Sequence, residues 1–394
     1  MGFVVQDWLM ELLWGTAKFF LNPVFYLLII LAAYLGISRV KAERKFFHVR
    51  AENAYFELKQ LIPLGFVIGI AISVVTIGAG VVIPLSVVAA AAIFTIVASL
   101  TTKIRFLSPA YIVSLALLLL TLVKWQGFSV PFLDEELAQL SGYFFPSVAV
   151  LMALLVLGEG ILIRRNGVKG SSPRIIRSKR GLPVGVHEVK RVWMIPVFLV
   201  IPGSALSAPF DWWPVFSVGG EIYSLLLVPF AVGFQQTTRG MLPEYAAEMM
   251  GKRVAGLGVL LLLLAAGSYW LPVLSVAAAG LAVLGREFLT LRQRSLEKNL
   301  PFYFSLRNDG VVILGIIPQS PASKMGLQIG EVITKVNGIP VHNEQSFYEA
   351  LQKNRAYCKL DVLDTNGEIR FVQRALFEGD HYQLGILFVQ EPAR

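Results

Sequence analysis

The feature that most constrains the fold is a series of long apolar runs that fills most of the chain up to residue 284. These runs occupy residues 19–37, 61–79, 81–100, 106–123, 144–163, 193–208, 215–234 and 254–284. A helix needs about 20 apolar residues to cross roughly 30 Å of hydrocarbon, and its backbone must satisfy its own hydrogen bonds there. Charged residues make up only 15% of the chain, against about 25% in a typical soluble protein. We therefore expect an α-helical polytopic membrane domain over 1–300, with about eight or nine spans.

Two of the apolar stretches are too long for one span. The stretch 61–100 contains Gly78-Ala79-Gly80 near its middle, which indicates a tight turn. The run 254–284 would extend about 46 Å as a single helix. Tyr269-Trp270-Leu271-Pro272 interrupts it, so we interpret it as a helical hairpin with interfacial aromatic residues at the turn. If this run crossed only once, the C-terminal domain would lie on the opposite side of the membrane.

Basic residues predict the orientation. Lys and Arg concentrate in 38–60 and 164–192, whereas 124–143 carries Asp134, Glu135 and Glu136, and 209–214 carries only Asp211. Because cytoplasmic loops are enriched in Lys and Arg, we expect basic cytoplasmic loops at 38–60 and 164–192, a cytoplasmic C-terminal domain and a multi-pass protein of the cell membrane. The net charge of +9 then reflects topology, and we expect no nucleic-acid partner.

The two basic loops each allow two interpretations. Phe47, Ala51, Tyr55 and Leu58 recur at helical spacing within 42–60, which indicates an interfacial helix on the lipid headgroups or, alternatively, a helix that docks a partner. The loop 164–192 is rich in Gly, Ser, Pro and Arg and is expected to be flexible. The basic residues of this loop only set the orientation of the chain in the membrane, or they bind anionic lipid or an acidic partner.

From about residue 301 the composition becomes that of a soluble fold. The apolar run 310–316 favours a strand, 343–354 an amphipathic helix, and 358–376 a hairpin that turns at Asn366-Gly367. Four short motifs follow in order: Ser320-Pro321-Ala322, Met325-Gly326-Leu327, Ile329-Gly330-Glu331-Val332-Ile333 and Val336-Asn337-Gly338-Ile339-Pro340-Val341. They resemble the signature of bacterial PDZ domains, with Glu331 where many relatives have Asp. The resemblance implies a small α+β PDZ-like domain over 301–394.

PDZ domains bind peptides by strand addition, in which an extended segment pairs with a sheet edge beside a helix. Bacterial versions are often circularly permuted, so that the binding loop and strand come last, and Tyr382-Gln383-Leu384-Gly385-Ile386-Leu387-Phe388 fits that place. Gly385 would expose backbone N–H groups. The resemblance implies a peptide-binding groove formed by Leu384, Gly385, Ile386 and Phe388, with Phe347 and Leu351 across from them. The alternative is that these residues are only the core of a small domain.

The sequence argues against enzymatic activity. His187-Glu188 is followed by Val189, Lys190 and Arg191, so the second histidine of a membrane zinc protease is absent. His48, His187, His342 and His381 all lie outside the apolar runs, and Cys358 is the only cysteine. We therefore expect no catalytic residues, no metal and no cofactor. Two alternatives stay open: an accessory or regulator of a membrane protease, and a transporter, for which Glu159 and Glu221 are the only acids within apolar runs.

A second resemblance covers the membrane region. Phe-Leu-Asn-Pro at 20–23, the apolar run after it and Arg-Val-Lys-Ala-Glu-Arg-Lys-Phe-Phe-His at 39–48 look like the MinJ family of division-site proteins of Gram-positive rod bacteria. The resemblance implies an adaptor that bridges the pole protein DivIVA to the MinD/MinC division inhibitor at the septum and poles. It gives no residue-level map of those contacts.

Overall fold

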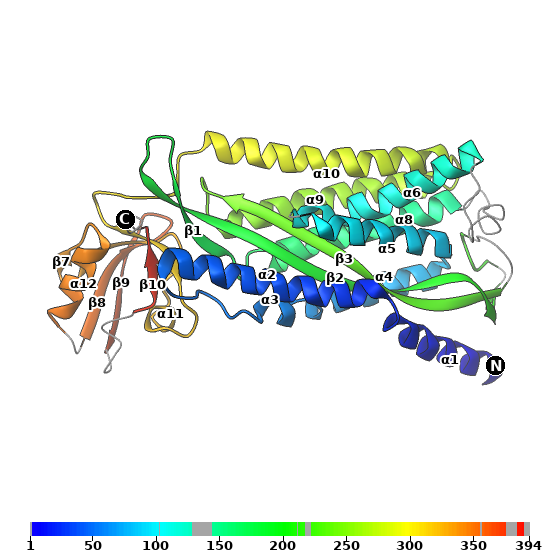
Figure 1. Cartoon of the computed structure of the whole chain (residues 1–394), viewed down its shortest axis with the longest axis horizontal. Coiled ribbons are helices and arrows are strands. Elements are labelled where there is room, and N and C mark those ends of the chain that lie inside the picture. The colour runs from blue at the N-terminus through cyan, green and yellow to red at the C-terminus, as the bar shows by residue number, and fades with distance from the viewer. Residues whose placement is uncertain are drawn as a thin grey trace.

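The apolar runs form a bundle of long helices in the computed structural model, which describes residues 2–101, 103–127, 144–210, 212–216, 222–354, 357–375 and 384–389. The helices of the bundle region are α1 (Gly2–Phe19), α2 (Pro23–Phe47), α3 (Phe56–Lys59), α4 (Pro63–Ala79), α5 (Leu85–Leu100), the 3-10 helix η1 (Ile104–Leu107), α6 (Pro109–Gln126), α8 (Phe144–Asn166), α9 (Pro243–Gly267) and α10 (Val273–Asn299). Six helical segments in the described part of the chain are long and apolar enough to cross a membrane, and α5 is a shorter apolar helix. The molecule is elongated, with α1 at one end and the C-terminal domain at the other (Figure 1).

Local sequence signals set the helix ends. Four of the long helices begin with proline at their first position, where the missing N–H costs nothing: α2, α4, α6 and α9. The side chains of Asn22 and Ser108 cap α2 and α6. Gly80 closes α4 with φ of +63°, so the turn predicted at 78–80 is confirmed. The predicted hairpin within 254–284 is also confirmed, because α9 ends at Gly267 and α10 begins at Val273.

The prediction of spanning helices at 193–208 and 215–234 is wrong, because residues 193–207 and 222–234 lie in β-strands. Strand β2 (Pro183–Ser207) pairs antiparallel with β3 (Ile222–Thr238), and the resulting ribbon runs along the bundle axis between the helices (Figure 1). One face of β2, with Trp193 and Ile195, lies in the cluster formed with α6, α8 and α9, and the other, with Met194, lies in the cluster formed with α2. A strand buried on both faces has a continuous apolar sequence, so hydropathy alone does not separate it from a helix.

Prolines explain why these runs are strands. Pro196 lies directly opposite Pro229 in the ribbon. Proline inside a helix removes a hydrogen bond and clashes with the preceding turn. In an antiparallel pair, alternate residues point their N–H away from the partner strand, so proline at such a position removes no hydrogen bond between the strands. The outward-facing N–H groups of Met194 and Phe198, two residues to either side of Pro196, confirm this register, because they bond to Leu61 O and Ser73 Oγ.

Helix α4 covers the outer edge of β2. Gly65, Gly69, Ser73 and Thr76 share one face of α4 at spacings of four, four and three residues. A Cβ at Gly65 would lie 2.0 Å from Met194 O, and one at Gly69 would lie 2.1 Å from Pro196 O. Further along, Ser73 Oγ accepts the Phe198 N–H at 2.8 Å and Thr76 Oγ1 donates to Phe198 O at 3.0 Å. This face of α4 therefore covers the edge of β2, and it forms hydrogen bonds with the backbone N–H and C=O of Phe198.

The first helix covers part of the opposite edge. In β3, the N–H of Leu225 donates to Glu11 Oε2 of α1 at 3.0 Å. Gly15, one turn further along α1, lies so close to Leu225 O that a Cβ there would be 2.7 Å away. Backbone that is not helical is tolerated at membrane depth only where protein or a cavity surrounds it. The two covered edges meet this requirement for the ribbon.

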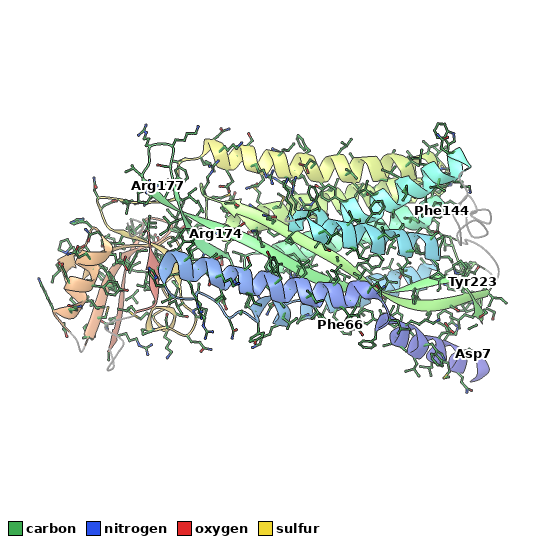
Figure 2. The ribbon with its side chains drawn as sticks, viewed as in Figure 1. Asp7, Phe66, Phe144, Arg174, Arg177 and Tyr223 are labelled. Carbon is green, nitrogen blue, oxygen red and sulfur yellow. The ribbon has the colours of Figure 1, made fainter. Side chains whose placement is uncertain are left out.

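The two segments expected to be basic loops are ordered. Residues 38–60 are not a loop, and 42–60 is not one interfacial helix: α2 continues to Phe47, His48 ends it with φ of +57°, and α3 follows at Phe56. Residues 164–192 are not flexible, because β1 (Ser172–Arg177) pairs antiparallel with the first part of β2. Arg174 and Arg177 on β1 lie at the end of the bundle near the C-terminal domain, far from Asp7 and Tyr223 (Figure 2).

Charged side chains inside the bundle are paired. Glu159 of α8 binds Arg286 of α10 at 3.0 Å and accepts a hydrogen bond from Ser108. Its partner is therefore Arg286, and not Arg164, which lies beside it in sequence. Glu57 bridges Arg39 at 2.7 Å and Arg191 at 3.0 Å. Glu221, the other acid considered for transport, lies outside the described residues.

The C-terminal domain is an antiparallel sheet with short helices. Its elements are β4 (Phe304–Ser305), β5 (Val311–Ile316), α11 (Pro321–Lys324), β6 (Val332–Val336), β7 (Ile339–Pro340), α12 (Glu344–Gln352), β8 (Tyr357–Leu363), β9 (Ile369–Ala375) and β10 (Ile386–Phe388). The sheet order is β10-β5-β6-β8-β9, with β7 pairing β6. The strand, helix and hairpin predicted at 310–316, 343–354 and 358–376 are therefore confirmed, the last turning where Gly367 has φ of +89°.

Candidate peptide-binding site

The six residues predicted to form the groove lie together. Leu384, Ile386 and Phe388 on and before β10 belong to one apolar cluster with Phe347 and Leu351 of α12. The rings of Phe347 and Phe388 meet edge to face, with centroids 5.0 Å apart. All five side chains are at most 4% exposed. The structure thus assembles the predicted set, and in this conformation its side chains fill the core between β10 and α12.

Gly385, in the predicted binding loop, has a left-handed backbone conformation. Its φ is +83°, a region that side chains disfavour. A Cβ at this position would lie 2.3 Å from Ser320 Cβ, and Ser320 is the residue that caps α11. The carbonyls of Leu384 and Gly385 accept hydrogen bonds from Ala322 and Ile317. The loop is therefore held against the start of α11 by its carbonyl groups.

Among the described strands, β10 has one edge without a partner strand. It is the edge strand of the sheet and pairs with β5 on one side, with Ile386 opposite Ile316. Ile317 N–H bonds to Gly385 O at 2.8 Å. In an antiparallel pair, hydrogen-bonded and non-bonded residues alternate, so the N–H and C=O of Ile386 point away from β5. An added strand would form hydrogen bonds with this N–H and this C=O. Tyr382 and Gln383, the first residues of the predicted loop, lie outside the described residues.

Glu331, which departs from the common Asp, supports the loop between α11 and β6. Its side chain is 2% exposed and accepts the Gln328 N–H at 2.8 Å. Arg370 of β9 binds the same carboxylate at 2.7 Å and also donates to Gly326 O. The longer Glu side chain thus reaches across to β9 and ties the loop to the hairpin.

The docking of this domain onto the bundle was not predicted. Strand β4 pairs with β2, Phe304 opposite Gly185, which joins the two regions by backbone hydrogen bonds. His187 of β2 lies within 2.8 Å of Leu314 O of β5 through Nε2. An apolar cluster at the contact includes Phe47 of α2, Ile175 of β1 and Leu387 of β10. The face of β10 opposite the core is therefore covered by the bundle, while its edge is not paired with a described strand.

The comparisons with known proteins agree with this geometry. The fold and site define a class of protein: a helical membrane domain that carries a PDZ domain, and residues 312–363 match the PDZ domain family. The chain is 44% identical over 392 residues to the cell division topological determinant MinJ of Bacillus subtilis (strain 168), covering 98% of this chain and 96% of that protein. It is 28% identical to the probable cell division topological determinant MinJ of Lacticaseibacillus paracasei, covering 95% and 98%. The chain belongs to the MinJ family of cell division topological determinants.

A third similarity is local. The magnetosome formation protease MamE of Magnetospirillum gryphiswaldense is 40% identical over 65 residues, which is 16% of this chain and 8% of that protein. A match of this length carries no inference about proteolysis. In the described part of the chain, no three His, Cys, Asp or Glu residues gather as a metal site would require. His187 instead has a structural partner in the PDZ domain.

Proposed function

We propose that this protein is a membrane-anchored adaptor for division-site selection that recruits its partners through the PDZ domain. The observation that carries the proposal is the edge of β10 beside Gly385, which is not paired with any described strand, in a chain of the MinJ family. An extended peptide would pair with Ile386 and place its side chains toward α12. Because the core between β10 and α12 is filled, binding would require Phe388, Phe347 and Leu351 to shift and open a pocket.

The membrane region serves as the anchor in this proposal, with 1–300 as the membrane domain and 301–394 as the PDZ domain. Basic residues at the PDZ end of the bundle support a cytoplasmic PDZ domain at the cell membrane. Membership in the MinJ family supports a place at the septum and poles, and partners of the DivIVA and MinD kinds. Holding the domain at the membrane raises its local concentration near partners that are also there.

The proposal is tested by complementation in Bacillus subtilis cells that lack their own MinJ. We expect the wild-type chain to restore normal cell length and the localisation of MinD. Gly385→Val should fail to do so, because the branched side chain collides with Ser320 and disfavours the positive φ. Membrane fractions should contain equal amounts of both chains.

A matched variant controls for backbone strain. Gly338 has φ of +82°, and a Cβ there would meet nothing within 4 Å. Gly338→Val imposes a similar conformational penalty away from the groove and should complement. If Gly385→Val complements as well as Gly338→Val, peptide recognition is not the working mechanism. If the wild-type chain reaches the membrane and restores neither readout, the adaptor function is refuted.

A further inference from the structure

A second surface, separate from the PDZ groove, has the character of a binding site. The turn between β1 and β2 and the chain that leaves α10 enclose a groove of about 980 Å³. Figure 1 shows the β1–β2 turn beside the end of α10. We call this surface the basic groove. Its lining residues are Ser178, Lys179, Arg180, Leu182, Pro183, Val184, Arg239, Lys298, Asn299, Leu300, Pro301, Phe302, Ser305 and Leu306.

The charges of the basic groove have one sign. The lining contains four cations and no Asp or Glu. Among the described residues, no carboxylate lies within ion-pair distance of Lys179, Arg180 or Lys298. Glu297 is close by, but it is 3% exposed and already accepts the N–H groups of Arg239 and Gly240. The groove therefore presents uncompensated positive charge to a ligand.

The basic groove also has an apolar lining and an ordered frame. Leu182, Leu300 and Leu306 are 59%, 41% and 51% exposed. The β1–β2 turn is closed by hydrogen bonds from Ser178 N–H to Leu182 O and from Gly181 N–H to Ser178 O. On the opposite wall, Arg239 stacks on Phe302 and donates to Glu297 O. The cations and the apolar side chains are thus held at set positions.

The distance of the groove from the hydrocarbon along α10 favours a protein ligand over a lipid surface. Glu287 of α10 binds Arg105, which lies where charges interrupt the apolar runs at the PDZ end of the bundle. Helix α10 continues from there to Lys298, a length of about 16 Å along its axis. The headgroup layer on each side of the hydrocarbon is only about 5–7 Å thick. With the hydrocarbon taken to end at the Arg105–Glu287 pair and α10 taken to run along the membrane normal, Lys298 and the groove lie beyond the headgroups, where exposed leucines face water.

We propose that the basic groove binds an acidic segment of a partner protein that also carries apolar side chains. Carboxylates of the segment would pair with Lys179, Arg180 and Lys298, and its apolar side chains would cover Leu182, Leu300 and Leu306. Such complementarity selects partners by charge and speeds their encounter. The site does not depend on strand addition at β10, so it stands or falls independently of the PDZ groove.

The test measures binding of a short fluorescent peptide of Glu, Leu and Ser to the full-length chain in phosphatidylcholine nanodiscs. A second peptide has every Glu replaced by Lys. We expect fluorescence anisotropy to detect the acidic peptide only, with affinity that falls as salt is added. The double variant Lys179→Glu with Lys298→Glu should raise Kd about tenfold or more, and Leu182→Ser with Leu306→Ser should also raise it.

Controls separate the groove from the general charge and from the lipid. Arg292→Glu with Lys335→Glu changes the net charge equally at exposed positions outside the groove and should leave Kd unchanged. Equal loss in the Arg292/Lys335 variant, or equal binding of the Lys peptide, would overturn the proposal. So would abolition of binding when phosphatidylglycerol replaces phosphatidylcholine, because the surface would then belong to lipid.

Discussion

His187 lies fully buried at the contact between β2 and the PDZ domain, outside the apolar run of 193–208, and both of its ring nitrogens are engaged. Nε2 is 2.8 Å from Leu314 O and Nδ1 is 3.2 Å from Ser171 Oγ. The neutral ring fits this site, with Nε2–H donating to the carbonyl and Nδ1 accepting from the hydroxyl. Burial lowers the pKa of His187 from 6.5 to about 4, against the opposing effect of the Leu314 hydrogen bond.

This pKa shift makes the stability of the protein depend on pH. The unfolded chain binds a proton at His187 below about pH 6.5, whereas the folded chain does so only near pH 4. The contribution of the neutral ring is therefore complete above about 6.5 and is lost as the pH falls toward 4. At pH 5 we expect a loss of about 2 kcal/mol from this group.

Thermal unfolding of the purified protein at pH 7 and pH 5 checks this prediction. His187→Gln keeps a donor toward Leu314 O but does not titrate, so its Tm should fall less between the two pH values than that of the wild type. His342 is exposed, and His342→Gln should behave as the wild type does. Equal falls in Tm for the wild type and His187→Gln would contradict the assignment.

Among the elements, α4 shows how a helix can take the place of a neighbouring strand. Its glycines bring its axis close to the carbonyls of Met194 and Pro196, and its hydroxyl groups bond to Phe198. The helix thus covers the edge of β2 beyond the residues that pair with β1 and β4, where the ribbon has only two strands. A two-stranded ribbon by itself is only marginally stable in water. The same four positions would otherwise suggest a face for helix–helix packing, since small residues are typical of that contact in membranes.

Two glycines of α4 provide a matched test. A Cβ at Gly65 would lie 2.0 Å from Met194 O, whereas one at Gly78 would meet nothing within 4 Å. Gly65→Ala should therefore destabilise the bundle by about 1–3 kcal/mol or more, because backbone must move to admit the methyl group. Gly78→Ala should leave stability unchanged or raise it, since alanine favours helix. Thermal unfolding of both variants in detergent tests this prediction. Equal Tm values would show that α4 does not pack closely against β2.

At the scale of the whole molecule, every long element runs along one axis and its ends gather at two poles. The PDZ domain, the basic groove and the ends of α2, α8 and α10 lie at one pole (Figure 1). The end of β2, where Leu206 pairs with Tyr223, lies near the other pole (Figure 2). About eight or nine spans were expected from the apolar runs, and in the described part of the chain these runs form seven helices and the two strands of the ribbon. Because two strands replace two helices, the number of passages between the poles is unchanged, and the hairpin at 254–284 returns the chain to the pole that holds the PDZ domain.

Cysteine labelling tests which pole is cytoplasmic. Cys358 is fully buried, and burial raises the pKa of its thiol to about 12, so the wild-type chain should react little with a membrane-impermeant maleimide. A cysteine at exposed Lys353 should be labelled only after protoplasts are lysed. A cysteine at exposed Ser207 should be labelled in intact protoplasts. The reverse pattern would place the PDZ domain outside and would refute the cytoplasmic adaptor.

The sequence by itself determined the membrane class, the turns at 78–80 and 269–272 and the order of the PDZ elements. These depend on local signals: apolar length, proline and glycine at turns, and short motifs read in order. The resemblance to PDZ domains also predicted that Leu384, Ile386 and Phe388 lie near Phe347 and Leu351, because the PDZ fold fixes their relative positions. Hydropathy measures only that a residue avoids water, so it assigned helices where Pro196 and Pro229 required another arrangement.

Only the tertiary structure decided the ribbon, the docking of the PDZ domain and the basic groove. A buried strand needs hydrogen-bond partners from elsewhere, and β2 pairs with β3 on one edge. On its other edge, Phe198 bonds to Ser73 and Thr76, which lie more than a hundred residues away in sequence. Likewise, the groove joins the β1–β2 turn to the chain after α10. Such partnerships depend on which distant segments meet in space, and no local pattern in the chain records that choice.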